Sequence, residues 1–303
     1  MGQDYYSVKN YTTYVDSHRD PFGLATYAAL KQVNGSILGL SSPIDYGSGF
    51  EWTLGMEELY KKCSIQVGLW VKENYATIPS GSADAAIKEL IAFVNKSETT
   101  YYIRVGYEFD SYANDYEPVQ YRQMFRYIVQ TFRSYAITNV AFVWHASGFK
   151  PRDNIPYKEW FPGRDVVTWC GVSLFQQPYH CNTSGDCASM RYADQFADFC
   201  ASINLPIMIA ESAPFGGIIE PTEEDSTGTS TRSTSSTILN EAGFSGDTWS
   251  IWFVPVLAFI SRHQVRAWSY INCNWDAQPM WQKEHAPGER WGDTRLEGEI
   301  YRI

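Results

Sequence analysis

Short apolar runs recur along the chain, and stretches with helical spacing lie between them. Each run is rich in Ile, Val, Leu, Met and aromatic residues and nearly free of charge, which predicts strands that are buried on both faces. There are seven such runs: SILGLSS (36–42), IQVGLWV (65–71), YYIRVGYE (101–108), VAFVWH (140–145), VVTWCGVSLF (166–175), PIMIAE (206–211) and VRAWSYIN (265–272).

The intervening segments predict helices. Apolar residues recur at helical spacing there, and a serine stands at the expected N-cap of the second segment. The expected helices are 52–62, 82–95, 121–135, 191–203 and 249–262. Regular alternation of strands and helices predicts an α/β fold with a parallel sheet, a single (β/α)8 TIM barrel. The eighth strand must then come from residues 1–30, where the pattern is weak.

One domain accounts for the whole chain, because barrels of this kind commonly occupy about this length as one unit. We therefore expect residues 1–303 to form a single catalytic domain. A long segment at about 216–246 is rich in Ser, Thr and Gly and cannot contribute to a core, so it predicts an extended loop over one edge of the barrel.

Two of the predicted strands end on a glutamate, Glu108 and Glu211. In a (β/α)8 barrel the carboxyl ends of the strands form the catalytic edge. Two carboxyl groups in one cleft are what glycosidic cleavage needs, one to protonate the leaving oxygen and one to attack or to activate water. The alternative is that each glutamate is a solvated strand end. Their common edge favours a joint function.

Several neighbours are candidate partners of this pair. Arg104 lies two side-chain alternations before Glu108 and should point the same way, where it could keep Glu211 ionised. The alternative is an arginine paired with a structural acid. The strand ends also carry candidate sugar contacts, each of which could instead be a core or capping residue: Trp144, His145, Trp268 and Trp275.

Composition narrows the choice of partner. Aromatic residues make up 16% of the chain, with 11 Trp and 21 Tyr, and these residue types pack on sugar faces as well as in cores. A net charge of −10 without a basic tract argues against nucleic acid or an anionic membrane. The histidines and cysteines lack metal-ligand spacing. We expect no metal and no cofactor, a polysaccharide or oligosaccharide partner, and a monomer.

Cysteines and sequons favour an extracellular setting. Cys181 and Cys187 bracket a short polar loop, as a disulfide would, whereas Cys170 and Cys273 lie in predicted strands and are expected to be buried thiols. Four sequons would be glycosylation sites in a secreted chain: Asn10, Asn34, Asn95 and Asn182. The first residues lack the pattern of a signal peptide, so we expect a mature or shortened form of a secreted protein.

Five segments together resemble glycoside hydrolase family 26, which belongs to a clan of retaining barrels: YYIRVGYEFDSYAND, NVAFVWHASG, FPGRDVVTWCGVSLF, LPIMIAESAP and VRAWSYINCNW. The resemblance covers about residues 36–281. In the family an arginine lies four residues before the acid/base glutamate, as Arg104 does before Glu108, and the nucleophile strand is a proline-led apolar run. The resemblance implies that Glu108 is the acid/base and Glu211 the nucleophile.

The resemblance further implies endo-acting cleavage of a β-linked polysaccharide, chiefly mannan and in some members mixed-linkage β-glucan or β-1,3-xylan. Mannan-cleaving members usually have histidine where this chain has Tyr107, which weakens that specificity. Phe175 stands where related barrels have a tyrosine that bonds the nucleophile, and Tyr179 is the candidate substitute.

A retaining glycoside hydrolase is therefore the predicted function, with Arg104, Tyr107, Phe175 and Tyr179 among its substrate-side residues. A non-catalytic glycan-binding protein on the same scaffold is the alternative, with Tyr107 and Phe175 as signs of a decayed site. Another chemistry on the same fold is the third reading, since barrels support many reactions.

Overall fold

A computed structural model describes residues 23–33, 37–41, 64–96, 98–175, 190–218, 248–277 and 292–296 of the chain. Its sheet has the order β2-β1-β3-β4-β5-β6-β7-β8. The strands are β1 (Gly23–Val33), β2 (Ile37–Ser41), β3 (Ser64–Trp70), β4 (Tyr101–Val105), β5 (Val140–Ala146), β6 (Trp169–Leu174), β7 (Ile207–Ser212) and β8 (Ala267–Trp268). All neighbours pair in parallel except β1 and β2, which are antiparallel.

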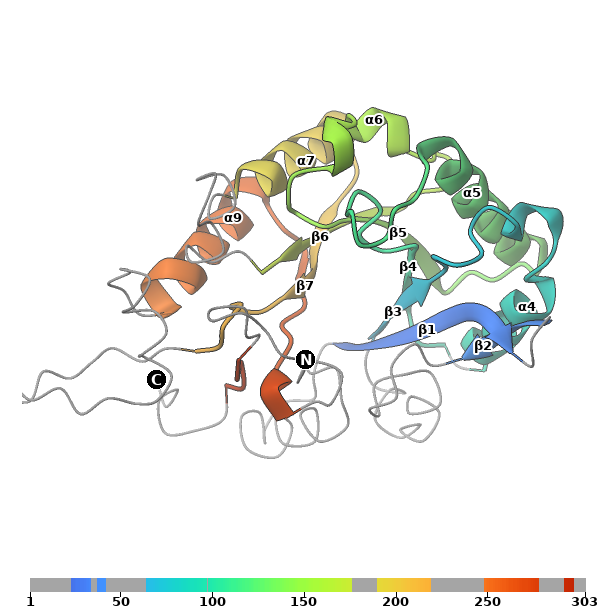
Figure 1. The fold of residues 1–303 in the computed structure, drawn as a ribbon, viewed down its shortest axis with the longest axis horizontal. Coiled ribbons are helices and arrows are strands. Elements are labelled where there is room, and N and C mark those ends of the chain that lie inside the picture. The colour runs from blue at the N-terminus through green and yellow to red at the C-terminus, as the bar shows by residue number, and fades with distance from the viewer. Residues whose placement is uncertain are drawn as a thin grey trace, which may run out of the picture.

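Helices follow the parallel strands and lie along the outside of the curled sheet (Figure 1). The α-helices are α4 (Asp84–Val94), α5 (Pro118–Ser134), α6 (Tyr157–Trp160), α7 (Arg191–Ser202) and α9 (Val254–His263). The 3-10 helices are η2 (Ile78–Ser80), η3 (Arg152–Asn154) and η6 (Trp275–Ala277), and η5 (Trp249–Phe253) is a π-helix that leads into α9. The predicted α/β architecture is thus confirmed. Within the described ranges the sheet ends at β8, and no strand pair joins β8 to β1.

Strand β1 supplies the parallel strand that the sequence indicated only weakly. Its sequence GLATYAALKQV holds small residues where the other strands hold Ile and Val, so its pattern was faint, yet Ala28, Ala29 and Leu30 are fully buried. The run at 36–42 was expected to be a parallel strand, and that expectation is wrong. Its core, Ile37–Ser41, forms a hairpin with β1, since only three residues separate the two strands.

Helix boundaries agree closely with the predicted ones. Helix α5 begins three residues earlier than expected, because Pro118 suits the first helical position and the Glu117 carboxylate caps the Gln120 amide. The predicted helix at 52–62 lies outside the described residues. So does most of the predicted loop at 216–246, of which only residues 216–218 are described.

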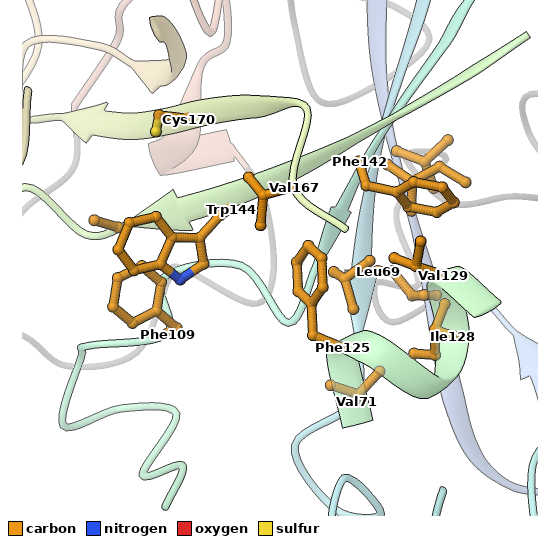
Figure 2. Packing of buried hydrophobic residues seen from close by; sticks show 14 of the residues in the cluster. Leu69, Val71, Phe109, Phe125, Ile128, Val129, Phe142, Trp144, Val167 and Cys170 are labelled. Atoms are coloured by element: carbon orange, nitrogen blue, oxygen red, sulfur yellow. The ribbon is translucent and has the colours of Figure 1, made fainter. Parts of the chain in front are cut away.

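The main core lies between the sheet and its helices. Figure 2 shows Phe125, Ile128 and Val129 of α5 directed at strand residues that include Leu69 and Phe142. A smaller cluster fills the inner side of the sheet and consists of Val143, Met208 and Ala210, with Tyr102, Trp169 and Ala267 against it. Alternate residues of each strand therefore face the helices and the barrel interior, as the pleat requires.

Trp144 belongs to the helix side of this arrangement. Its ring stacks on Phe109 at 4.6 Å and packs against Phe161, Phe196 and Phe199, with no exposed surface. Figure 2 shows the Phe109–Trp144 pair. The expectation that Trp144 forms a wall of a sugar subsite is wrong, because the strand alternation turns it away from the interior.

One disulfide joins the sheet to its helical layer. Cys170 of β6 bonds Cys200 of α7, so Cys170 is not the buried thiol that the sequence suggested. Cys273 is fully buried, as expected. Cys181 and Cys187 lie outside the described residues.

Candidate active site

Glu108 follows β4 in an unusual backbone conformation. Its φ is +51°, a left-handed value that costs free energy in a residue with a β-carbon, and Gly106 turns the chain with a φ of +56° just before it. The Asn114 amide donates hydrogen bonds to the carbonyls of Tyr107 (2.8 Å) and Glu108 (3.1 Å), and the Ser111 amide donates to Glu108 as well. These contacts hold the carboxyl-bearing turn in place.

Glu211 reaches the barrel interior through an irregularity in the sheet. Met208 and Ala210 face inward, so strict alternation would turn Glu211 toward the helices. The register between β6 and β7 shifts at this point, with Val172 opposite Ile209 but Ser173 opposite Glu211. Such a bulge re-aims the side chains around it. The Gln66 amide donates to the Ala210 carbonyl at 2.7 Å and anchors the bulge across the interior.

Arg104 and Tyr27 hold the Glu211 carboxylate. The Arg104 guanidinium, fully buried, forms an ion pair and a hydrogen bond with Oε1 of Glu211. The Tyr27 hydroxyl donates to the same oxygen at 3.0 Å. Arg104 also lies over the rings of Tyr27 and Tyr107, at 5.2 and 5.3 Å from their centroids. The predicted inward orientation of Arg104 and its contact with Glu211 are both observed.

A second set of contacts reaches Glu108. The Ser173 hydroxyl donates to Oε1 of Glu108 at 2.7 Å. His145, also fully buried, has Nε2 at 2.9 Å from the Ser173 oxygen and Nδ1 at 3.2 Å from Nη1 of Arg104. One hydrogen-bonded network therefore runs from Glu211 through Arg104, His145 and Ser173 to Glu108.

The environments of the two carboxyl groups differ in the way that acid/base chemistry needs. Removal from water and then the charge of Glu211 raise the pKa of Glu108 to about 8, against a smaller lowering by the Ser173 hydrogen bond. Burial alone would lower the pKa of Arg104, but the charge of Glu211 raises it above its ordinary value. Glu108 is thus protonated at neutral pH beside a guanidinium that remains charged.

Burial also sets the protonation of the aromatic neighbours. Desolvation, with the Arg104 charge, puts the pKa of His145 well below its ordinary value, so the imidazole is neutral. Desolvation and the Glu211 charge raise the pKa values of Tyr27 and Tyr107 far above neutrality, and both remain phenols. The Tyr27 hydroxyl is therefore a permanent donor to Glu211.

The remaining candidates are placed differently. Trp268 is 39% exposed, and its indole N–H donates to the Ser212 hydroxyl at 2.7 Å. Its neighbour Ala267 packs on the inner cluster and Trp268 itself pairs with Ile209 of the main core, so alternation turns its ring to the helix side. Phe175 and Trp275 lie in a small apolar cluster with 5% and 2% exposure. They have little surface to offer a sugar, so the capping alternative suits them better than substrate contact. Tyr179 lies outside the described residues.

Two residues of the site escaped the sequence analysis. Tyr27 makes the hydrogen bond to Glu211 that the sequence had led us to seek from Tyr179, and it comes from the weakly patterned strand β1. Ser173 is a small polar residue within an otherwise apolar run, VVTWCGVSLF. A buried hydroxyl needs a hydrogen-bond partner, so a serine in a buried strand was the signal that could have pointed to a polar contact there.

Within the described ranges no group of three or more His, Cys, Asp or Glu side chains is placed to hold a metal ion. The same part of the chain contains no helix long and apolar enough to cross a membrane.

A protonated and an ion-paired carboxyl group on the carboxyl-terminal side of a curled parallel sheet define the class of site that glycosidases use. No family model matches the chain. It is 27% identical over 301 residues to a beta-1,3-xylanase of Alcaligenes sp, covering 98% of this chain and 60% of that protein. It is also 27% identical over 303 residues to the beta-1,3-xylanase TXYA of Vibrio sp, with coverages of 98% and 61%. The chain thus spans about three-fifths of the length of these relatives.

Solved structures of glycoside hydrolase family 26 share the fold. A beta-mannanase from Bacteroides ovatus has a TM-score of 0.55 at 12% identity, covering 96% of this chain and 78% of that one. A modular endo-beta-1,4-mannanase from Cellulomonas fimi has a TM-score of 0.52 at 14% identity, with coverages of 98% and 64%. These structures confirm the (β/α)8 fold class and show that the chain is similar in fold to members of family 26.

Proposed function

We propose that residues 1–303 are the catalytic domain of a retaining glycoside hydrolase that cleaves a β-linked polysaccharide within its chain, with β-1,3-xylan as the first candidate substrate. The observation that carries this proposal is the pairing of Glu108, whose pKa is raised to about 8, with Glu211, which is ion-paired to Arg104, on one buried network. One carboxyl group able to give a proton and one able to attack are the two requirements of the reaction.

The proposed reaction has two steps. Glu108 protonates the oxygen of the leaving sugar while the Glu211 carboxylate attacks the anomeric carbon, which breaks the glycosidic bond and forms a glycosyl-enzyme ester. Glu108, now ionised, then takes a proton from water, and the water oxygen displaces Glu211 from the anomeric carbon. Arg104 and Tyr27 orient Glu211 and stabilise its charge before attack and after release.

The choice of β-1,3-xylan rests on two observations. The two relatives described above are named beta-1,3-xylanases, and they match over nearly the whole of this chain. In addition, Tyr107 replaces the histidine that mannan-cleaving members of the family usually carry. Tyr107 is partly exposed on the inner side of the sheet, beside Arg104 and His145, and is the proposed contact with the sugar ring.

The biological setting follows as part of the same proposal. An enzyme acting on a cell-wall polysaccharide works outside the cell, where the disulfide between Cys170 and Cys200 is stable. We propose a secreted, monomeric glycoprotein that needs no cofactor.

Product release from a panel of polysaccharides tests the proposal. The panel contains β-1,3-xylan, β-1,4-mannan, mixed-linkage β-glucan and laminarin, and the wild type is compared with Glu108→Gln and Glu211→Gln. We expect oligosaccharides of several lengths from β-1,3-xylan and a loss of at least roughly 10⁴-fold in both variants. Mannan as the preferred substrate would overturn the choice of sugar. Binding without turnover by the wild type would favour the glycan-binding alternative.

Rescue by azide separates the two roles. Azide should restore turnover of an activated aryl glycoside by Glu211→Ala with inverted product, because a small anion then replaces the missing nucleophile. With Glu108→Ala it should give a glycosyl azide of retained configuration, because azide needs no general base. The reverse pattern would exchange the two assignments.

A further inference from the structure

Donor and acceptor chemistry fixes the direction of every hydrogen bond in the network. A guanidinium can only donate, so Nδ1 of His145 accepts from Arg104 at 3.2 Å. The proton of this neutral imidazole is then on Nε2, which donates to the Ser173 oxygen at 2.9 Å. With its oxygen accepting from His145, the Ser173 hydroxyl points its own proton at Oε1 of Glu108, 2.7 Å away.

The three residues Arg104, His145 and Ser173 form a hydrogen-bonded relay, and they are held in a fixed geometry. Arg104, His145 and Ser173 have no exposed surface, and they come from β4, β5 and β6, which are consecutive in the sheet. The register shift at Ser173 sets it opposite Glu211 while its hydroxyl bonds Glu108. The hydroxyl thus has two partners and no freedom to turn elsewhere.

We propose that Ser173 is the positioning residue that decides which oxygen of Glu108 carries the catalytic proton, and that His145 sets the direction in which Ser173 donates. The inference rests on the proposed function. Since Oε1 accepts from Ser173, the proton of Glu108 is on Oε2, the oxygen left free for the leaving group. After that proton is transferred, the same Ser173 hydrogen bond stabilises the Glu108 carboxylate that must act as the base.

The relay also joins the two half-reactions. Arg104 donates to both Glu211 and His145, and one strand further His145 donates to Ser173. When Glu211 becomes an ester it loses its charge, and the repulsion that adds to desolvation in raising the pKa of Glu108 disappears with it. The direction of the relay does not change, so Ser173 is already oriented toward the carboxylate that forms.

Substitution of Ser173 by Ala removes the donor and gives a test that depends on the leaving group. Two aryl β-glycosides of the same disaccharide are compared, one with a dinitrophenol, which leaves without protonation, and one with an unactivated phenol. We expect kcat/KM to fall roughly 10- to 100-fold for the unactivated phenol and less than roughly threefold for the dinitrophenol. An equal fall for both would overturn the inference, because loose packing does not distinguish leaving groups.

The pH profile gives a second readout. The charged groups that act on Glu108 are Glu211 and Asp110, which raise its pKa, and Arg104, which lowers it, while His145 is neutral. The Ser173 hydrogen bond also lowers it. Removing this hydrogen bond should move the basic limb of kcat/KM to higher pH. A basic limb at the wild-type position in Ser173→Ala would contradict the proposed contact.

Matched variants separate positioning from folding. Ser173→Thr keeps the hydroxyl and should restore the phenol/dinitrophenol ratio of the wild type even if the added methyl lowers the melting temperature. Thr168→Ala removes a hydroxyl that bonds the Phe142 backbone just before β6, and should leave that ratio unchanged. His145→Asn combined with Ser173→Ala should change the ratio no more than Ser173→Ala alone, since both act through one contact.

Failure of the inference is distinguishable from failure of the proposed function. If the wild type cleaves no β-glycan and Glu108→Gln changes nothing, the proposed function is wrong. If the wild type is active and Glu108→Gln is not, while Ser173→Ala behaves alike on both leaving groups, the proposed function stands and the role of Ser173 falls.

Discussion

Trp144 and His145 are consecutive residues of β5 with the same absence of exposed surface, yet they occupy opposite environments. Trp144 lies among the rings of Phe109, Phe161, Phe196 and Phe199 on the helix side of the sheet. His145 lies on the inner side, between Arg104 and Ser173. The two faces of one sheet therefore have different roles. Apolar packing on the outer face stabilises the sheet, and the inner face holds a buried polar network.

The inner face carries buried charges, and the free-energy cost of burying them must be offset by apolar packing on the outer face. A buried guanidinium and carboxylate lose their hydration, and each tolerates this loss only while the other is present. The outer face loses nothing of the kind, since its side chains gain free energy by leaving water. Substitutions on the two faces should consequently differ in kind as well as in size.

The largest effect is expected from Arg104→Met, which removes the positive charge of the inner-face network. It leaves Glu211 buried without its cation, so we expect a loss of roughly 3–5 kcal/mol in the free energy of unfolding and at least roughly 10³-fold in kcat/KM. Chemical denaturation and kinetics measure the two. The control is Arg126→Met, which breaks the exposed pair with Asp165 and should cost less than about 1 kcal/mol. Similar losses in the two variants would contradict the inner-face assignment.

The next effect is expected from Trp144→Ala on the outer face. Emptying this fully buried site should cost roughly 3–5 kcal/mol of stability, while kcat at a temperature where the variant remains folded stays within about threefold of the wild type. Tyr107→Leu is the counterpart on the inner face, because Tyr107 is partly exposed beside Arg104 and His145, and it should raise KM with a smaller change in melting temperature. A selective rise in KM for Trp144→Ala would return Trp144 to the substrate site.

The smallest effect is a gain in stability from Glu108→Gln. The pKa of Glu108 is raised to about 8 in the folded protein, above its ordinary value of 4.5, so the folded state keeps a proton that the unfolded chain releases as pH rises between these values. Wild-type stability contributed by this group is therefore complete below about pH 4.5 and is lost toward pH 8. Glutamine has no proton to lose, and the variant should melt roughly 2–6 °C above the wild type at pH 8.5. The same difference at pH 5 and pH 8.5 would refute the raised pKa.

The sequence predicts most of the fold because the buried strands are recognisable from their apolar composition. Strands β3 to β7 are rich in Val, Ile, Leu, Met and aromatic residues, and α5 and α7 repeat apolar residues at helical spacing. Strand β1 was missed in detail because alanine and glycine carry little preference for a strand, and its burial comes from the neighbours that pack on it. Local pattern cannot report such tertiary burial.

The site was predictable in its charged members and not in its polar ones. Glu108, Arg104 and Glu211 stand out because a charge at or near the end of an apolar strand needs a reason. Tyr27 is 184 residues from Glu211 in the chain, and nothing local links the two. Strict alternation after Met208 and Ala210 would turn Glu211 outward. The register shift between β6 and β7, opposite Ser173, brings it inside, and such a shift depends on the pairing of two strands that are distant in the chain.

The disulfide between Cys170 and Cys200 closes a covalent ring that contains the chain from β6 to α7. Ser173 lies inside this ring, three residues from its start. A protease that cuts the backbone once between Ser173 and Cys200 would open the ring without separating the two fragments, which would remain one molecule until a reductant acts. This second covalent connection would keep β6, which carries the Ser173 hydroxyl, attached to the rest of the molecule after such a cut.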